Sequence, residues 1–112
     1  MSEPKILRGE IWWVNLDPTK GSEIKKTRPC LVLTNDTLNR LRMTVVVVPL
    51  STAARAHPPI TVAVNCDGRN AVAVVDQIRA VAKHRFKSRL GTLAAAELEE
   101  VCQAVSLILE LG

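Results

Sequence analysis

The sequence predicts a mainly β protein, a small antiparallel barrel with one C-terminal helix packed against one end or side. Short runs rich in β-branched and other apolar residues alternate with turn-forming segments, which is typical of short strands joined in sequence order. A single stretch with three-and-four apolar spacing closes the chain. The length of 112 residues, 47% of them hydrophobic, fits one domain spanning residues 1–112.

The first half of the chain is expected to contain three strands. Residues 9–16 form the first strand, and the Pro-, Gly- and Lys-containing residues 17–27 form a long hairpin loop. The apolar residues 29–33 form the second strand, followed by a short helical turn that begins near Thr34. Residues 44–50 are the clearest strand because they include four consecutive valines, and Pro49 is expected at an edge or a bulge.

The second half is expected to contain a hairpin, one more strand and the helix. Residues 60–64 and 71–75 are the two arms of the hairpin around an Asp-Gly turn in residues 65–70. Residues 78–81 form a shorter strand. Thr92 is expected to cap a helix over residues 93–111, whose buried stripe would contain Leu98, Val101, Val105 and Ile108.

Composition limits the function classes. Fifteen Lys and Arg against eleven Asp and Glu give a net charge of +4, which favours a polyanionic partner. The three cysteines lie far apart with no C-x-x-C pair, so a zinc ribbon and a redox pair are not predicted. The two histidines are also far apart and no metal-binding motif occurs, so no metal and no cofactor is expected. A start without a long apolar run predicts a soluble cytoplasmic protein with no membrane partner.

Aromatic side chains are scarce, at 3% of the chain, which argues against a broad base-stacking platform. The three aromatic residues are Trp12, Trp13 and Phe86. Neighbouring residues of a strand point to opposite faces. Trp13 shares a face with Ile11 and is therefore predicted to lie in the core, which leaves Trp12 for an interface or a binding groove.

Polar residues gather where predicted strands begin and end, and loops at the ends of a rigid scaffold are common places for a site. Each of them alone is more often an ordinary solvated charge or a turn former, but together they are expected to meet at one rim of the barrel. They are Glu23, Lys25, Lys26, Thr27 and Arg28 before the second strand, Ser51 and Thr52 after the valine-rich strand, and Asp76, Gln77 and Arg79 after the hairpin.

Three segments resemble a known family. RGEIWWVNLDPTKGSEIKKTRPCLVL at residues 8–33, VVVVPLST at 45–52 and VDQIRAV at 75–81 are similar to MazF/PemK-type toxins, the mRNA interferases of type II toxin–antitoxin systems. The resemblance implies an SH3-like β-barrel with a C-terminal helix, a fold shared with the gyrase poison CcdB. It also implies a homodimer that cuts single-stranded RNA at preferred sequences without a metal. The expected partner is a cognate antitoxin whose acidic, flexible C-terminal tail occupies the RNA groove.

The resemblance also implies roles for particular residues. Arg28 matches the arginine of the family's Arg-Pro pair, where its fixed charge suits the phosphate. Ser51 matches a hydroxyl that contacts the scissile phosphate, and Thr52 is an equally placed substitute. Either Glu23 or Asp76 is the general base, with Asp76 favoured by its position at a strand end.

The remaining candidates bind RNA rather than react with it. Lys25, Lys26 and Arg79 are expected on the RNA backbone, with Arg85 as a weaker candidate, and Thr27 is expected to bind RNA. Asn39, Thr52 and Gln77 are expected to contact base edges in unpaired RNA. The alternative function is a non-catalytic toxin or binding module, either a gyrase-poison-like CcdB analogue or an RNA-binding barrel.

Overall fold

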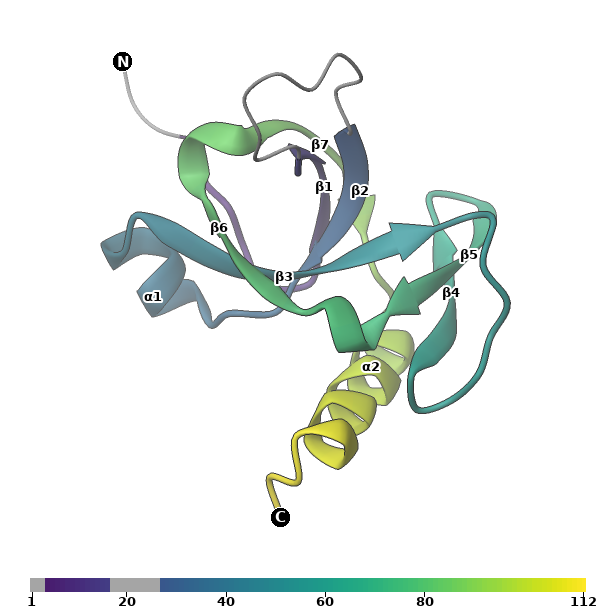
Figure 1. Cartoon of the computed structure of the whole chain (residues 1–112). Helices are drawn as coiled ribbons and strands as arrows, with labels where there is room; N and C mark the ends of the chain where they lie inside the picture. The colour runs from purple at the N-terminus through teal and green to yellow at the C-terminus, as the bar shows by residue number, and fades with distance from the viewer. Residues whose placement is uncertain (1–3, 17–26) are drawn as a thin grey trace, which may run out of the picture.

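The computed structural model describes residues 4–16 and 27–112, and in these two stretches strands predominate (Figure 1). The strands are β1 (Glu10–Asn15), β2 (Thr27–Val32), β3 (Thr44–Ser51), β4 (Thr61–Cys66), β5 (Arg69–Val74), β6 (Arg79–Ala82) and β7 (Phe86–Thr92). The α-helices are α1 (Asp36–Leu41) and α2 (Ala95–Ile108), and the short 3-10 turns are η1 (Val75–Gln77) and η2 (Lys83–Arg85). Among these described residues, no helix is long and apolar enough to cross a bilayer.

The strands form one antiparallel sheet in the order β4-β5-β3-β2-β1-β7, with β6 also paired to β3. The central strand β3 changes partner along its length, because residues 44–47 pair with β6 whereas Leu50 and Ser51 pair with β5. Figure 1 shows the result: β1, β2, β3, β6 and β7 curl into a half-barrel, and the β4–β5 hairpin lies beside the end of β3. The predicted mainly β fold with a C-terminal helix is confirmed.

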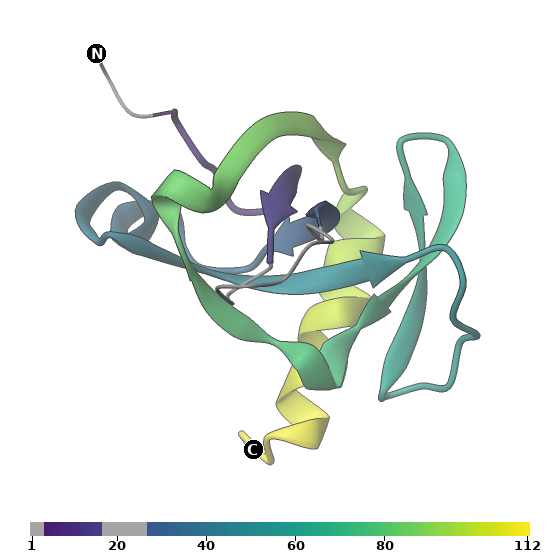
Figure 2. The same cartoon turned by 45° about the horizontal axis from the view of Figure 1, so that its top comes forward.

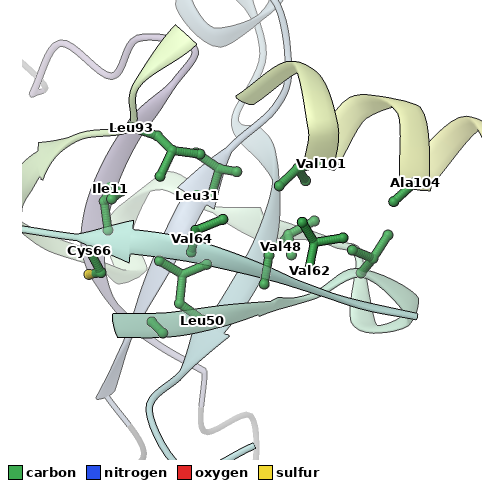
Figure 3. Packing of buried hydrophobic residues seen from close by; sticks show 13 residues of the cluster. Ile11, Leu31, Val48, Leu50, Val62, Val64, Cys66, Leu93, Val101 and Ala104 are labelled. Carbon is green, nitrogen blue, oxygen red and sulfur yellow. The ribbon is translucent and has the colours of Figure 1, made fainter. Parts of the chain in front are cut away.

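The curled sheet buries side chains on both of its faces. One cluster lies between the sheet, the β4–β5 hairpin and α2, and includes Leu31, Val64 and Val101. Figure 3 shows Val101 and Ala104 of α2 facing the side chains of the sheet. The other cluster comes from the strands of the curl and includes Trp12. The two clusters together hold the sheet in its curled shape. This shape decides which strand ends lie next to each other.

The prediction for the two tryptophans is wrong. Trp12 is buried, with 6% of its surface exposed, whereas Trp13 is 36% exposed. The prediction assumed one buried face, but β1 buries Ile11 in the first cluster and both Trp12 and Val14 in the second. Trp13 does share the face of Ile11, and it lies where that face opens into a cleft.

Three local predictions also need correction. The polar strand β7 was not expected, because the sequence of Phe86–Thr92 shows no apolar alternation. In the structure only one residue of this strand is buried. Thr92 ends this strand, so the N-cap of α2 is Ala94. Pro49 lies within the central strand β3, between the residues that pair with β6 and those that pair with β5. A residue without a backbone N–H is tolerated at such a change of partner.

The buried carboxylate of Glu10 ties the N-terminal segment to the core. Glu10 is 9% exposed, and its Oε1 accepts hydrogen bonds from the Leu7 backbone N–H at 2.8 Å and from Trp12 Nε1 at 2.9 Å. Arg89 Nε lies 3.9 Å from Oε2. A single oxygen therefore satisfies two donors, one of which is fully enclosed.

Glu10→Ala is expected to lower the free energy of unfolding by about 1–3 kcal/mol, because it leaves the buried indole N–H without an acceptor. Glu10→Gln keeps an acceptor oxygen and should lose less. Urea denaturation followed by circular dichroism measures both changes. An alanine variant as stable as the glutamine variant would show that these hydrogen bonds do not contribute.

Candidate functional site

A cleft of about 530 Å³ lies between the end of β3 and the β4–β5 hairpin. Figure 2 shows this hairpin beside the arrowhead of β3. Strands β1, β2, β3 and β7 contribute to its lining, and residues of the hairpin form another part of it, the hairpin wall. The lining residues are Trp13, Arg28, Pro29, Leu50, Ser51, Thr52, Ala53, Cys66, Asp67, Arg69, Ala71 and Leu90.

Strand register brings Arg28 and Ser51 to the same place. Cys30 of β2 pairs with Pro49 of β3, and continuing this antiparallel register by two residues sets Arg28 opposite Ser51. Arg28 is exposed, and its guanidinium makes no hydrogen bond or ion pair with any of the described residues. The following Pro29 disfavours helical backbone at Arg28, which suits the extended strand it occupies. The guanidinium is therefore available to an anion in the cleft.

The Ser51 hydroxyl is oriented by the backbone that follows it. Its Oγ accepts hydrogen bonds from the N–H groups of Ala53 at 3.1 Å and Ala54 at 3.2 Å. Because these bonds use the lone pairs of the oxygen, the hydroxyl proton remains to be donated outward. Thr52 also lines the cleft, but Ser51 is the hydroxyl that this pair of bonds holds at the strand end.

The guanidinium groups of Arg28 and Arg79 influence the pKa of the buried thiol of Cys30. Burial raises the pKa of Cys30 to about 12, although the positive charges of Arg79 and Arg28 lower it in part. The thiol is thus protonated at neutral pH and is not a nucleophile there. Arg79 acts on this thiol together with Arg28, although Arg79 does not line the cleft.

The predicted meeting of all strand-end residues at one rim is only partly correct. Arg28, Ser51 and Thr52 share the cleft, but Asp76 and Gln77 lie in η1 and Arg79 in β6, outside its lining. The reason is the change of partner along β3, because η1 connects β5 to β6 beside the middle of that strand rather than at its end.

Other predicted residues are placed differently. Asn39 lies in α1, next to the start of β3, so the length of that strand separates it from the cleft (Figure 1). It is 2% exposed, and its Nδ2 donates to the Thr34 carbonyl at 2.8 Å, so base contact by Asn39 is not supported. Thr27 opens β2, exposed and adjacent to Arg28. Glu23, Lys25 and Lys26 fall outside the described residues.

Sequence reasoning missed the cleft wall formed by Asp67 and Arg69 and the floor residue Trp13. The Asp-Gly turn was predicted, and Asp67 and Gly68 adopt the positive φ values of 52° and 87° that such a two-residue turn requires. An arginine directly after the turn was the available signal. Nothing local in the sequence indicates that this hairpin faces the end of β3.

Chemically, the cleft offers two guanidinium groups, the hydroxyls of Ser51 and Thr52, one carboxylate and an indole ring. Paired guanidinium groups and hydroxyl donors suit phosphate oxygens. Within residues 4–16 and 27–112, no cluster of three or more His, Cys, Asp or Glu side chains is arranged to hold a metal ion. The arrangement therefore fits an anionic polymer such as a nucleic acid strand.

Comparisons with known proteins agree with this chemistry. Residues 7–109 match the family described as the PemK-like, MazF-like toxin of type II toxin–antitoxin systems. The chain is similar to endoribonuclease MazF9 of Mycobacterium tuberculosis, with 38% identity covering 93% of this chain and 96% of the relative. It is also similar to endoribonuclease toxin MazF of Escherichia coli K12, with 31% identity covering 90% and 91%.

Solved structures show the same fold. A mycobacterial endoribonuclease in complex with its cognate antitoxin superposes with a TM-score of 0.80 at 26% identity, covering 96% of this chain and 97% of that one. MazF from Deinococcus radiodurans gives a TM-score of 0.80 at 25% identity, covering 98% and 99%.

Proposed function

The chain belongs to the PemK-like, MazF-like family of type II toxin–antitoxin toxins and is an endoribonuclease, and we propose that it cuts single-stranded RNA without a metal ion. The reaction takes place in the cleft beside β3, by attack of a ribose 2′-hydroxyl on the adjacent phosphate. The observation that carries this proposal is that the exposed Arg28 guanidinium, which has no partner among the described residues, lines the same cleft as the anchored Ser51 hydroxyl.

Each of the two groups has a defined task. The 2′-oxygen forms a bond to phosphorus while the bond to the 5′-oxygen breaks, which leaves a 2′,3′-cyclic phosphate and a 5′-hydroxyl. Arg28 neutralises the charge that grows on the non-bridging oxygens of the phosphate, and its two parallel N–H groups fit two of them. Ser51 donates a hydrogen bond from its hydroxyl to the same non-bridging phosphate oxygens.

The proton of the 2′-hydroxyl needs an acceptor, and the 5′-oxygen needs a proton. We assign the acceptor role to Glu23 in preference to Asp76, because Asp76 lies outside the cleft lining. The departing 5′-oxygen lies on the opposite side of the phosphorus and takes its proton from water.

We propose an antitoxin and a second copy of the chain as protein partners. Solved relatives from mycobacteria and from Deinococcus radiodurans form complexes with antitoxins. We propose that the cognate antitoxin of this chain places an acidic, flexible C-terminal tail against Arg28 and Arg69, competing with RNA. We further propose that the toxin acts in the cytoplasm as a homodimer, so light scattering should give about twice the chain mass of 12.3 kDa.

The cleavage chemistry is tested with purified protein, single-stranded RNA and an excess of EDTA. We expect fragments that end in 2′,3′-cyclic phosphate, with new 5′-hydroxyl ends that polynucleotide kinase can label directly. A requirement for Mg²⁺ together with 5′-phosphate products would overturn the mechanism. RNA that is bound but left intact would favour the non-catalytic alternative instead.

A further inference from the structure

The cleft holds three side chains that the proposed reaction does not use. Trp13 lies at the floor, and Asp67 and Arg69 belong to the hairpin wall opposite Arg28 and Ser51. None of the three makes a hydrogen bond, ion pair or aromatic contact with another of the described residues. An exposed indole, a carboxylate and a guanidinium in one concavity form the mixed apolar and polar lining that ligand sites use.

The hairpin wall is held in place rather than left to adapt. Asn65 Oδ1 accepts a hydrogen bond from the Gly68 N–H at 2.8 Å, which closes the turn between Asp67 and Arg69. The Asn65 backbone N–H donates to Glu97 Oε1 of α2 at 2.9 Å. The hairpin is therefore braced against the C-terminal helix, and its side chains are positioned before a ligand arrives.

Asp67 and Arg69 both influence the pKa of Cys66, a thiol that lines the cleft. Burial and the carboxylate of Asp67 raise the pKa of the Cys66 thiol, whereas the guanidinium of Arg69 lowers it. Cys66 itself lines the cleft and pairs with Arg69 across the hairpin. Asp67 Oδ1 also lies close to Gly91 of β7, at 3.8 Å from the position of a Cβ at that glycine. The carboxylate is thus near the β7 edge of the cleft.

We propose that Trp13, Asp67 and Arg69 form a subsite for one nucleotide next to the scissile phosphate. This proposal rests on the proposed function, because Arg28 and Ser51 hold the scissile phosphate on the opposite wall. Trp13 stacks against the base, Arg69 binds the neighbouring backbone phosphate, and Asp67 accepts a hydrogen bond from the exocyclic amino group of the base. The cleft volume of about 530 Å³ lies in the range of about 300–1,000 Å³ usual for small-ligand sites.

The chemistry of the carboxylate selects the occupant. An ionised aspartate only accepts hydrogen bonds, and the donor assigned to it is the exocyclic amino group that cytosine, adenine and guanine carry and uracil lacks, so these three bases are favoured over uracil. The subsite therefore contributes to the sequence preference of cleavage, whereas the phosphate contact of Arg69 contributes affinity and salt dependence.

Binding is measured by fluorescence anisotropy with a short single-stranded RNA in an Arg28→Ala background, so that cleavage is slow during the measurement. Adding Arg69→Ala should reduce the slope of log affinity against log salt by about 0.7, the value for one phosphate contact on a single strand. Adding Trp13→Ala should weaken binding by about 5- to 150-fold, and Trp13→Phe by less. Arg42→Ala is the matched control, since Arg42 is an exposed arginine outside the cleft.

Base selection is measured with the otherwise wild-type enzyme on RNAs that differ at one position beside a mapped cut. Asp67→Asn offers donors as well as an acceptor and should bring uracil closer to the amino-bearing bases in kcat/KM. The subsite is overturned if Arg69→Ala and Arg42→Ala change the salt slope equally, or if Trp13→Ala binds as tightly as its parent. Full cleavage by Arg28→Ala would instead refute the proposed function, and the two failures are thus distinguishable.

Discussion

Replacing Arg28 with alanine is expected to lower kcat for RNA cleavage by about 100- to 1,000-fold, the loss typical for removing one preorganised group that stabilises transition-state charge. The guanidinium is exposed and makes no hydrogen bond or ion pair within the described part of the chain, so its removal breaks no internal contact there. Single-turnover cleavage of a defined RNA measures the change, and the far-ultraviolet circular dichroism spectrum should remain that of the parent.

Two further variants separate charge from geometry. Arg28→Lys keeps the positive charge but loses the paired N–H groups, so its activity should fall between those of the parent and the alanine variant. Arg42→Ala removes an equal charge outside the cleft and should cut RNA at the parental rate. An Arg28→Ala enzyme that keeps more than a tenth of the parental kcat would exclude the assigned role.

Trp12→Ala is expected to lower the free energy of unfolding by about 3–5 kcal/mol, the usual cost of truncating a large buried aromatic side chain. Trp12 packs edge to face against Phe86, with ring centroids 5.9 Å apart, and its N–H is bonded to Glu10. The neighbouring Trp13→Ala should cost far less, because that ring is half exposed at the cleft floor. Urea denaturation of the two variants provides a matched comparison.

The expected difference between the two tryptophans is also a test of the fold. If Trp12→Ala and Trp13→Ala lower the free energy of unfolding equally, the two rings are equally buried, and β1 does not place one in the core and the other in the cleft. If Trp13→Ala is the less stable of the two, Trp13 rather than Trp12 is the core residue of β1.

The strands that were predicted correctly are those with strong local signals. Four consecutive valines disfavour a helix whatever surrounds them, and the Asp-Gly pair between two apolar runs is a turn by its own backbone preferences. The missed strand β7 lacks both signals, since most of its side chains are exposed and it is held by backbone pairing with β1. Backbone pairing leaves little trace in the side-chain sequence.

The site residues that were predicted correctly also have local signals in the sequence, and those that were missed do not. Arg28, Ser51 and Thr52 were found because they lie at strand ends and match a family motif, and they do share the cleft. Asp76 satisfied the same criteria but lies elsewhere, because β3 exchanges β6 for β5 between Val47 and Leu50. Arg69 was missed because its place depends on how a whole hairpin is oriented.

The sequence by itself determined the family, the mainly β architecture with its terminal helix, and the wall of the cleft formed by Arg28 and Ser51. These depend on properties of neighbouring residues: chain stiffness, turn preference and a motif of fixed spacing. Only the tertiary structure decided which strand ends meet, which face of β1 is closed, and that Asp67 and Arg69 lie across from Arg28. Such features arise because the sheet curls and buries both faces, and strand order and curvature are set by contacts between residues far apart in the chain.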